Sequence, residues 1–170
     1  MSCESHLKRL DNKQEKIYVA AEATRTELEK FAAKNKHIGN PTTLMCFCAI
    51  GSYTLWNVYK KLDIKNTKFI AGEYVDHGND YNHHCWNEVD DQIIDITATQ
   101  FKHIYYRVFI PEPNYAKNIY LKDKFHYVNG AATRWINQDW VFVQTIAQNK
   151  LAIQQMVLNS VVATKTALKT

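Results

Sequence analysis

The first part of the chain has the hydrophobic spacing of an amphipathic helix. From residue 4 to about residue 36, apolar residues recur at intervals that place them on one helical face, and lysine, glutamate and arginine fill the other positions. The segment that follows, residues 37–41, contains a glycine and a proline, which end helices. We therefore expect an N-terminal amphipathic helix within residues 1–36.

A second helical stripe begins at Cys48. Apolar and small residues follow it at steps of four, three, four and three residues, and the last of them is Leu62. This spacing predicts a helix that runs from Cys48 to Lys61 or Leu62. The cysteine would then stand in the first turn of the helix.

The pattern changes its period after Asp63. Four short runs have the composition of β-strands, and they cover residues 68–75, 83–89, 92–97 and 105–110. Two of them flank Asp90-Asp91 and predict a hairpin. From residue 131 to residue 168 few helix breakers occur, which predicts one or two C-terminal helices. The order along the chain is helices first, then a small antiparallel sheet, then helices again. This order predicts a single α+β domain over residues 1–170.

Composition narrows the classes of function. The 170 residues carry a net charge of +4 with a pI near 8.8, and no run of five or six like charges marks a nucleic-acid-binding arm. No stretch approaches the roughly 18 apolar residues of a membrane span, and the polar N-terminus has no signal-peptide pattern. We expect a cytoplasmic protein without nucleic-acid or membrane partners, whose four cysteines stay reduced.

Cys48 has the chemical setting of a nucleophile. A thiol attacks acyl carbons as the thiolate, so its pKa must fall from about 8.5, usually through a helix N-terminus and an imidazolium. Cys48 begins the helical stripe and would face the unpaired N–H groups at that end. Gly51, within the same helix, leaves room for a substrate or a facing strand. Cys46 precedes the helix and has weaker support.

The predicted hairpin brings a histidine and an aspartate together. If Asp90-Asp91 is a two-residue turn, the numbers of paired residues sum to 181, and His84 and Asp95 are diagonal neighbours with Cβ atoms about 7 Å apart. A carboxylate on one ring nitrogen would fix the tautomer and turn the other nitrogen toward the thiol. The residues on either side of His84 would point to the opposite face of the hairpin.

Two segments resemble a known superfamily. The strings CAIGSYTLWNVYKKL and HCWNEVDDQIIDITATQF are similar to bacterial and phage members of the transglutaminase-like, papain-fold cysteine hydrolases. The shared pattern is a cysteine that opens a helix, a His-x-Trp strand and a strand that ends in Asp before Thr, all within residues 44–101. The resemblance implies Cys48 as nucleophile, His84 as general base and acid, and Asp95 as orienting carboxylate, on a papain- or transglutaminase-like domain.

This arrangement predicts acyl transfer through a thioester. The expected activity is that of a thiol-dependent amide hydrolase or acyltransferase: a peptidase, protein deamidase or transglutaminase-like enzyme that acts on a protein or peptide and needs neither cofactor nor metal. Trp86, on the same face as the triad, is expected to form a pocket wall rather than to lie in the core. Gln100, a polar residue near the end of the hairpin, and Gly51 are the other candidates for substrate contact.

Three other interpretations stay open. Leader-peptide peptidases of bacterial peptide maturation share the order of cysteine, His-x-Trp and aspartate. A protein that kept the fold and lost the activity would act as a binding module. A zinc-binding module would draw on six soft or borderline ligands, although their spacing differs from the paired pattern of zinc sites. These ligands are Cys46, Cys48, His77, His83, His84 and Cys85.

Overall fold

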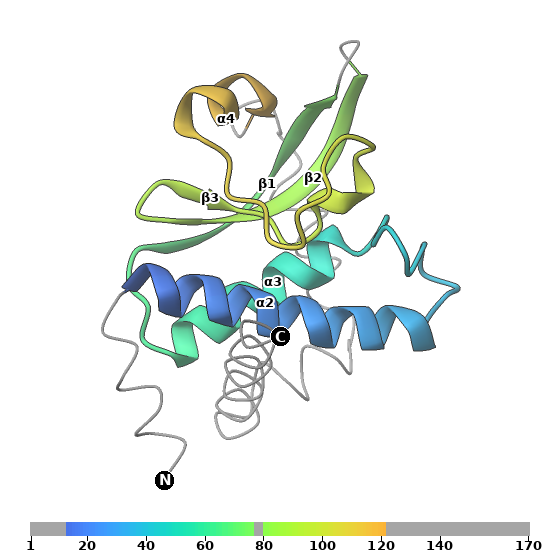
Figure 1. Ribbon diagram of the computed structural model, residues 1–170, viewed down its shortest axis with the longest axis horizontal. Helices are drawn as coiled ribbons and strands as arrows, with labels where there is room; N and C mark the ends of the chain where they lie inside the picture. The colour runs from blue at the N-terminus through green and yellow to red at the C-terminus, as the bar shows by residue number, and fades with distance from the viewer. Residues whose placement is uncertain (1–12, 77–79, 122–170) are drawn as a thin grey trace, which may run out of the picture.

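The computed structural model describes residues 13–76 and 80–121 (Figure 1). Its helices are α2 (Lys13–Lys34), α3 (Cys48–Lys61), the 3₁₀ helix η1 (Ala98–Gln100) and α4 (Pro113–Ile119). Its strands are β1 (Thr67–Asp76), β2 (Asp80–Val89), β3 (Gln92–Ile94) and β4 (Tyr120–Leu121). The start of the predicted N-terminal helix and the helices predicted over residues 131–168 lie outside the described residues.

The strands form one antiparallel sheet in the order β3-β2-β1-β4. The long pair β1 and β2 is in register over ten residues, from Thr67 opposite Val89 to Asp76 opposite Asp80. Helices α2 and α3 lie next to each other on one side of the sheet, and α4 lies on the other side (Figure 1). This arrangement confirms the predicted α+β class.

The helices among the described residues are not membrane spans, because none is both long enough and apolar enough to cross a bilayer.

The turn between β2 and β3 has the predicted length and register. Asp90 and Asp91 both adopt positive φ angles, 49° and 63°, as the central residues of a type I′ hairpin turn require. Aspartate tolerates this left-handed conformation better than most residues. The pairs on either side are Val89 with Gln92, then 88 with 93, then 87 with 94. Each pair sums to 181, so the predicted register is confirmed.

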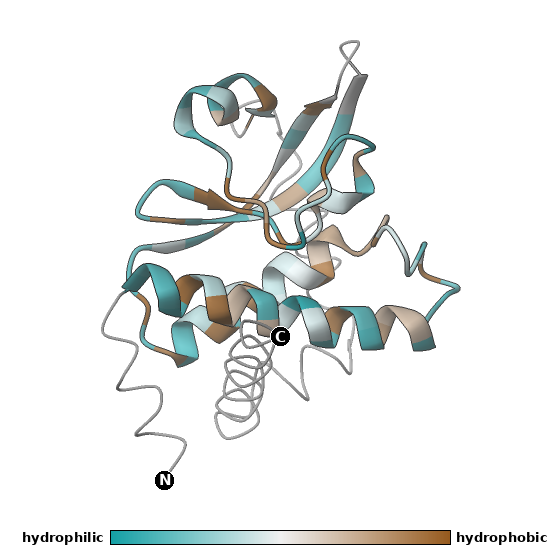
Figure 2. Cartoon of the chain, viewed as in Figure 1, coloured by the Kyte–Doolittle hydropathy of each residue, from teal (hydrophilic) through white to brown (hydrophobic). Residues whose placement is uncertain are grey.

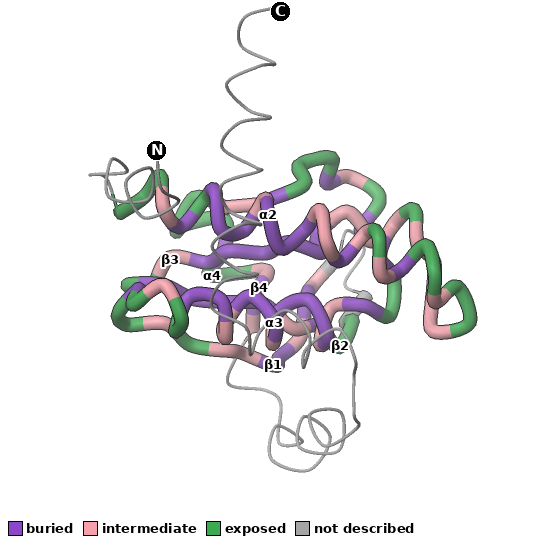
Figure 3. Tube along the Cα trace, turned by 90° about the horizontal axis from the view of Figure 1, so that it is seen from below, coloured by how far each residue is buried: buried purple, intermediate pink, exposed green. Residues whose placement is uncertain are grey.

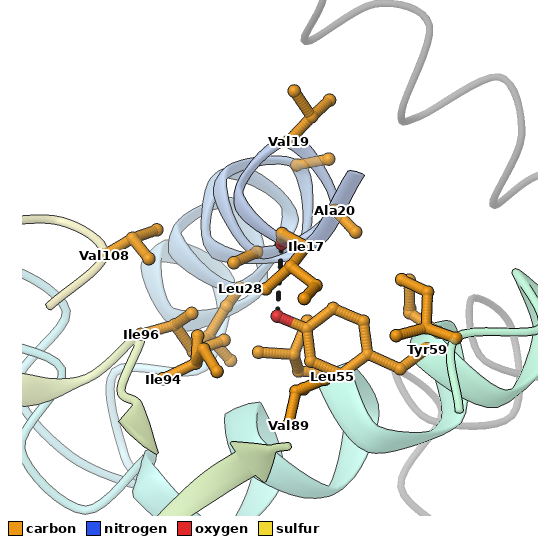
Figure 4. Packing of buried hydrophobic residues seen from close by; sticks show 14 of the residues in the cluster. Ile17, Val19, Ala20, Leu28, Leu55, Tyr59, Val89, Ile94, Ile96 and Val108 are labelled. Carbon is orange, nitrogen blue, oxygen red and sulfur yellow. Dashed lines mark hydrogen bonds between the residues drawn. The ribbon is translucent and has the colours of Figure 1, made fainter. Parts of the chain in front are cut away.

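Apolar side chains form two cores, one on each face of the sheet. The first lies between α2, α3 and the hairpin (Figure 4). In it the hydroxyl of Tyr59 on α3 donates a hydrogen bond of 3.1 Å to the carbonyl oxygen of Ile17 on α2. The second core lies on the other face and includes Tyr74, Trp86 and Tyr120. The strand residues that alternate between these faces therefore meet different neighbours.

The burial pattern of the helices follows from this layering. On α2 and α3 the buried positions recur along the sides that face the rest of the molecule (Figure 3), and the apolar residues follow the same sides (Figure 2). Each helix therefore packs one side against the rest of the molecule and leaves most of its lysines exposed, as the 3.6-residue period of their sequences predicts.

The strand predicted over residues 105–110 is absent from the structure. Tyr105 and Tyr106 are exposed, and Phe109 makes a single bridge with Asp95 through backbone hydrogen bonds of 2.8 and 2.9 Å. Because Asp95 pairs with Phe109 instead of with β2, strand β3 ends at Ile94, three residues earlier than predicted.

Helix α4 was not expected from the sequence. Pro111 and Pro113 follow directly after the strand predicted over residues 105–110, and Pro113 begins a helix. Proline fits the first turn of a helix because the N–H that it lacks would have no partner there. This preference is the signal that could have located α4.

Candidate active site

Cys48 is the first residue of α3, as predicted. The residue before it, Phe47, is fully buried and accepts the first backbone hydrogen bond of the helix from Gly51 N–H at 2.9 Å. The Cys48 side chain is partly buried at this end of the helix, where backbone N–H groups have no partner within the helix. Cys46 lies outside the helix, is exposed and has a φ of 71°. The structure therefore distinguishes the two cysteines by position and exposure.

His84 and Asp95 are in direct contact. His84 Nε2 lies 2.6 Å from Asp95 Oδ2, and neither side chain is accessible to solvent. The two residues meet because the tight Asp90-Asp91 turn sets them diagonally across the hairpin on one face. The hairpin register derived from the sequence thus leads to the contact that it predicted.

Four hydrogen bonds hold the Asp95 carboxylate. Besides His84, Oδ2 accepts from the hydroxyl of Tyr120 at 2.9 Å, and Oδ1 accepts from the backbone N–H and the hydroxyl of Thr97 at 2.8 and 3.2 Å. Burial by itself raises the pKa of Asp95, but His84, Thr97 and Tyr120 together bring it below its ordinary value. Asp95 is therefore a buried anion with its partners in place.

The anion favours a charged imidazole. Burial lowers the pKa of His84, but the charge and hydrogen bond of Asp95, together with the interaction with Cys48, outweigh it and raise the pKa from 6.5 to about 10. The pair is thus poised to accept a proton from a neighbouring group. A histidine with this partner is the base that a thiol nucleophile needs.

The thiol next to this pair is acidic. A hydrogen bond from Cys85 lowers the pKa of Cys48 well below its ordinary value, and His84 adds to the effect, which together outweigh the opposing effect of burial. The pKa of Cys85 is raised, because the neighbouring Cys48 sulfur takes the negative charge and burial disfavours a second one. Of the two thiols, Cys48 is therefore the one that ionises more readily.

Helix α3 is docked on the strand that carries Cys85. One turn after Cys48, the hydroxyl of Ser52 donates to the carbonyl oxygen of Cys85 at 2.9 Å, and the amide of Asn87 donates to the carbonyl oxygen of Ser52 at 3.0 Å. Residues four apart share a helix face, so these bonds set Cys48 against β2. These bonds thereby hold the start of α3 next to Cys85 and His84, the residues that lower the pKa of Cys48.

Gln100 reaches the second nitrogen of the imidazole. Its Nε2 lies 3.0 Å from His84 Nδ1 and 3.1 Å from the carbonyl oxygen of Thr97. The structure thus brings Gln100 together with the three triad candidates, through contact with the histidine itself.

Trp86 and Gly51 occupy different surroundings from those expected. Trp86 is fully buried in the second core, with its ring roughly parallel to His84 at a centroid distance of 6.2 Å, rather than at an open pocket wall. A Cβ on Gly51 would lie 2.6 Å from Leu28 Cδ2 and 3.3 Å from Thr97 Cγ2. The room at this glycine is therefore filled by α2 and by the segment after β3, not left open to substrate.

Three residues of the site region were missed by sequence reasoning. Tyr120 lies 25 positions after Asp95 in a two-residue strand, and nothing in its spacing marks it. Cys85 was assigned to the face away from His84, and its role appears only once α3 packs there. Arg25, buried on α2, donates from Nη1 to the carbonyl oxygen of Ile96 at 2.5 Å, beside the aspartate. A charged residue on the apolar stripe of the helix was the one available signal.

Within residues 13–76 and 80–121, no three or more histidine, cysteine, aspartate or glutamate side chains are grouped so that they could hold a metal ion. The zinc interpretation also draws on His77, which lies outside these ranges. No family model, curated protein or solved structure matches the chain.

Proposed function

We propose that the protein is a thiol-dependent amide hydrolase or acyltransferase built on a papain- or transglutaminase-like arrangement, with a protein or peptide as substrate. The observation that carries the proposal is the buried contact of 2.6 Å between His84 and Asp95, next to a cysteine at the start of a helix. A buried aspartate held by four hydrogen bonds orients the imidazole, and the imidazole interacts with an acidic thiol. These are the parts that nucleophilic catalysis by cysteine requires.

The reaction follows from the proton positions. The Cys48 thiolate attacks the amide carbonyl carbon and forms a carbon–sulfur bond. His84 then gives its proton to the leaving nitrogen as the carbon–nitrogen bond breaks, which leaves a thioester on Cys48 and a free amine. In the second step water, or another amine, attacks the thioester. His84 takes a proton from the attacking group, and the Cys48 sulfur leaves as the thiolate.

The start of α3 also supplies a hydrogen-bond donor for the developing oxyanion. The backbone N–H of Cys48 lies in the first turn, where such groups have no intrahelical partner. Donors of this kind are typically worth about 3 kcal/mol in the transition state. The positive end of the helix dipole favours the same negative charge.

The proposal is tested first by the reactivity of the thiols. We expect iodoacetamide at pH 7 to alkylate Cys48 at least about tenfold faster than Cys46 or Cys85, because a thiolate is the reactive form. Rates are measured for each cysteine by mass spectrometry of its peptide. In Asp95→Asn the His84 pKa falls and the Cys48 rate drops, whereas Asp91→Asn, the same change at an exposed turn, leaves the rate unaltered.

The second test looks for the covalent intermediate. We expect an activated acyl ester, such as a p-nitrophenyl ester, to add one acyl group to Cys48, detected as an increase in intact mass. The adduct should be absent from Cys48→Ala and should accumulate in His84→Ala less than in the wild type. Cys46→Ala is the matched control and should still acylate. An acidic Cys48 that forms no acyl adduct would favour the non-catalytic binding module instead.

A further inference from the structure

The orientation of the Gln100 amide is determined by its second partner. A carbonyl oxygen accepts hydrogen bonds and cannot donate them, so the Gln100 atom 3.1 Å from Thr97 O must be the NH₂ group. The same nitrogen lies 3.0 Å from His84 Nδ1. With two hydrogens to give, Gln100 donates one to Thr97 and one to the imidazole.

This bond determines which form of the imidazole Gln100 accommodates. Nε2 of His84 faces a carboxylate that three other donors already hold as an anion, so Nε2 carries a hydrogen. Nδ1 can accept from Gln100 only through its lone pair. The Gln100 bond therefore requires the neutral imidazole, whereas the imidazolium has hydrogens on both nitrogens and would face the amide donor to donor.

The other groups around His84 either favour the charged imidazolium or favour neither form of the ring. Asp95 and the Cys48 thiolate favour the imidazolium, and Cys85 assists by stabilising that thiolate. Tyr74 from β1 and Tyr120 from β4 flank the ring at centroid distances of 6.1 and 6.3 Å, and burial raises the pKa of Tyr120 far above neutrality.

We propose that Gln100 is a positioning residue for His84, one that holds Nδ1 as a hydrogen-bond acceptor and so sets the proton balance between the imidazole and the Cys48 thiol. This inference rests on the proposed function for its catalytic meaning. When Nδ1 takes the thiol proton, the Gln100 bond is lost and the amide must turn away. Gln100 thus opposes premature formation of the ion pair, while Asp95 promotes it.

The test compares two substitutions that affect the imidazole in different ways. Gln100→Met has a similar length and removes the donor, so the ion pair should be favoured and Cys48 alkylation at pH 6 should rise about three- to tenfold, the value of one hydrogen bond. Gln100→Glu places a carboxylate at Nδ1, so His84 should stay charged to higher pH, while the added negative charge keeps the pH 6 alkylation rate below that of Gln100→Met. A purely structural role would leave the protonation of the His84 ring unchanged in both variants.

A second readout observes the ring nitrogens directly. In protein labelled with ¹⁵N-histidine, the Nδ1 resonance of His84 is followed across a pH titration, and the pH at which Nδ1 loses its proton should be higher in Gln100→Met than in the wild type, because the substitution removes the donor that favours the neutral ring. Thr99→Val is the control, because Thr99 lies in the same 3₁₀ helix but its hydroxyl donates to the carbonyl oxygen of Thr43, and it should leave both readouts unaltered.

The outcomes separate this inference from the proposed function. If the pH at which Nδ1 loses its proton does not rise in Gln100→Met, the role of Gln100 is overturned even if Cys48 is catalytic. An unreactive Cys48 with the expected Nδ1 response would overturn the enzyme proposal and leave Gln100 as the residue that sets the tautomer of His84.

Discussion

The hydrogen on Cys85 decides which of two neighbouring sulfurs carries the negative charge. A thiol that donates to a thiolate stabilises it, and this bond is the largest cause of the lowered pKa of Cys48. The proposed nucleophile thus depends on a second cysteine that need not touch substrate. Strand β2 carries both Cys85 and His84, and both lower the pKa of Cys48.

We expect Cys85→Ala to raise the pKa of Cys48 and to slow its alkylation at pH 7 on the order of tenfold, the value of a hydrogen bond to a charged group. Cys85→Ser keeps a donor and should retain most of the rate. Peptide-resolved alkylation across pH 5 to 9 gives the measurement. Equal rates in the alanine variant and the wild type would show that Cys85 does not tune the nucleophile.

The same thiolate makes the stability of the protein depend on pH. The folded pKa of Cys48 lies below its unfolded value of about 8.5. The stability that the Cys48 thiolate contributes is therefore fully present above pH 8.5 and is lost as the pH falls through the folded pKa. His84 acts in the opposite sense. Its pKa rises from 6.5 to about 10, so its contribution is present below 6.5 and is lost as pH rises through 10.

Removing the thiol should therefore cost more stability at high pH than at low pH. We expect Cys48→Ala to lower the melting temperature more at pH 8.5 than at pH 5, with about 2–4 °C for each kcal/mol of difference. Thermal unfolding at both pH values measures it, with Cys46→Ala as the exposed control. A loss of the same size at pH 5 and at pH 8.5 would contradict the depressed pKa.

At the scale of elements, the approach of α2 to α3 depends on Gly51. A Cβ on Gly51 would lie 2.6 Å from Leu28 Cδ2, which leaves no space for a methyl group, and Leu28 is itself fully buried. The glycine allows the start of α3 to pack closely on α2 and on the segment after β3. The nucleophile is thereby held by packing as well as by hydrogen bonds.

We expect Gly51→Ala to destabilise the fold by about 1–3 kcal/mol through overpacking, even though alanine is the better helix former. Urea unfolding gives the free energy. The matched test is a double-mutant cycle with Leu28→Ala, which removes the contacted methyl group. The double variant should be more stable than the sum of the two single effects predicts, and strict additivity would show that the contact is not the cause.

At the scale of the whole molecule, α2 is joined to distant segments by two arginines of different burial. Arg25 is 3% exposed, donates to Ile96 O at 2.5 Å and pairs with Glu29 at 2.9 Å. Arg107 is exposed and pairs with Glu22 and Glu29 at 3.1 and 2.8 Å. Burial lowers the pKa of Arg25, while its carboxylate partner limits the fall.

These two arginines should contribute very differently to stability. We expect Arg25→Ala to cost about 2–3 kcal/mol, because it leaves the buried carbonyl oxygen of Ile96 without its donor and leaves Glu29 with only the exposed Arg107 as partner. Arg107→Ala should cost less than about 1 kcal/mol, and the cost should shrink further in high salt. Urea unfolding at low and high salt measures both. Similar costs for the two variants would contradict the inference that burial makes Arg25 contribute more to stability than Arg107.

The sequence by itself determined the parts of the site that depend on local geometry. The stripe that begins at Cys48 located the start of α3, because helical period is a property of neighbouring residues. Two aspartates that tolerate positive φ specified a two-residue turn, and that turn set the register that brings His84 to Asp95. The catalytic roles of these residues stay a proposal.

Only the tertiary structure decided the contacts between segments that are far apart in the chain. Tyr120 reaches Asp95 because β4 adds to the edge of the sheet, and Cys85 meets Cys48 because α3 packs on that face. Trp86 became a core residue for the same reason, since a second layer covers its side of the sheet. Side-chain periodicity states which residues share a face, but what covers that face depends on packing among all the elements.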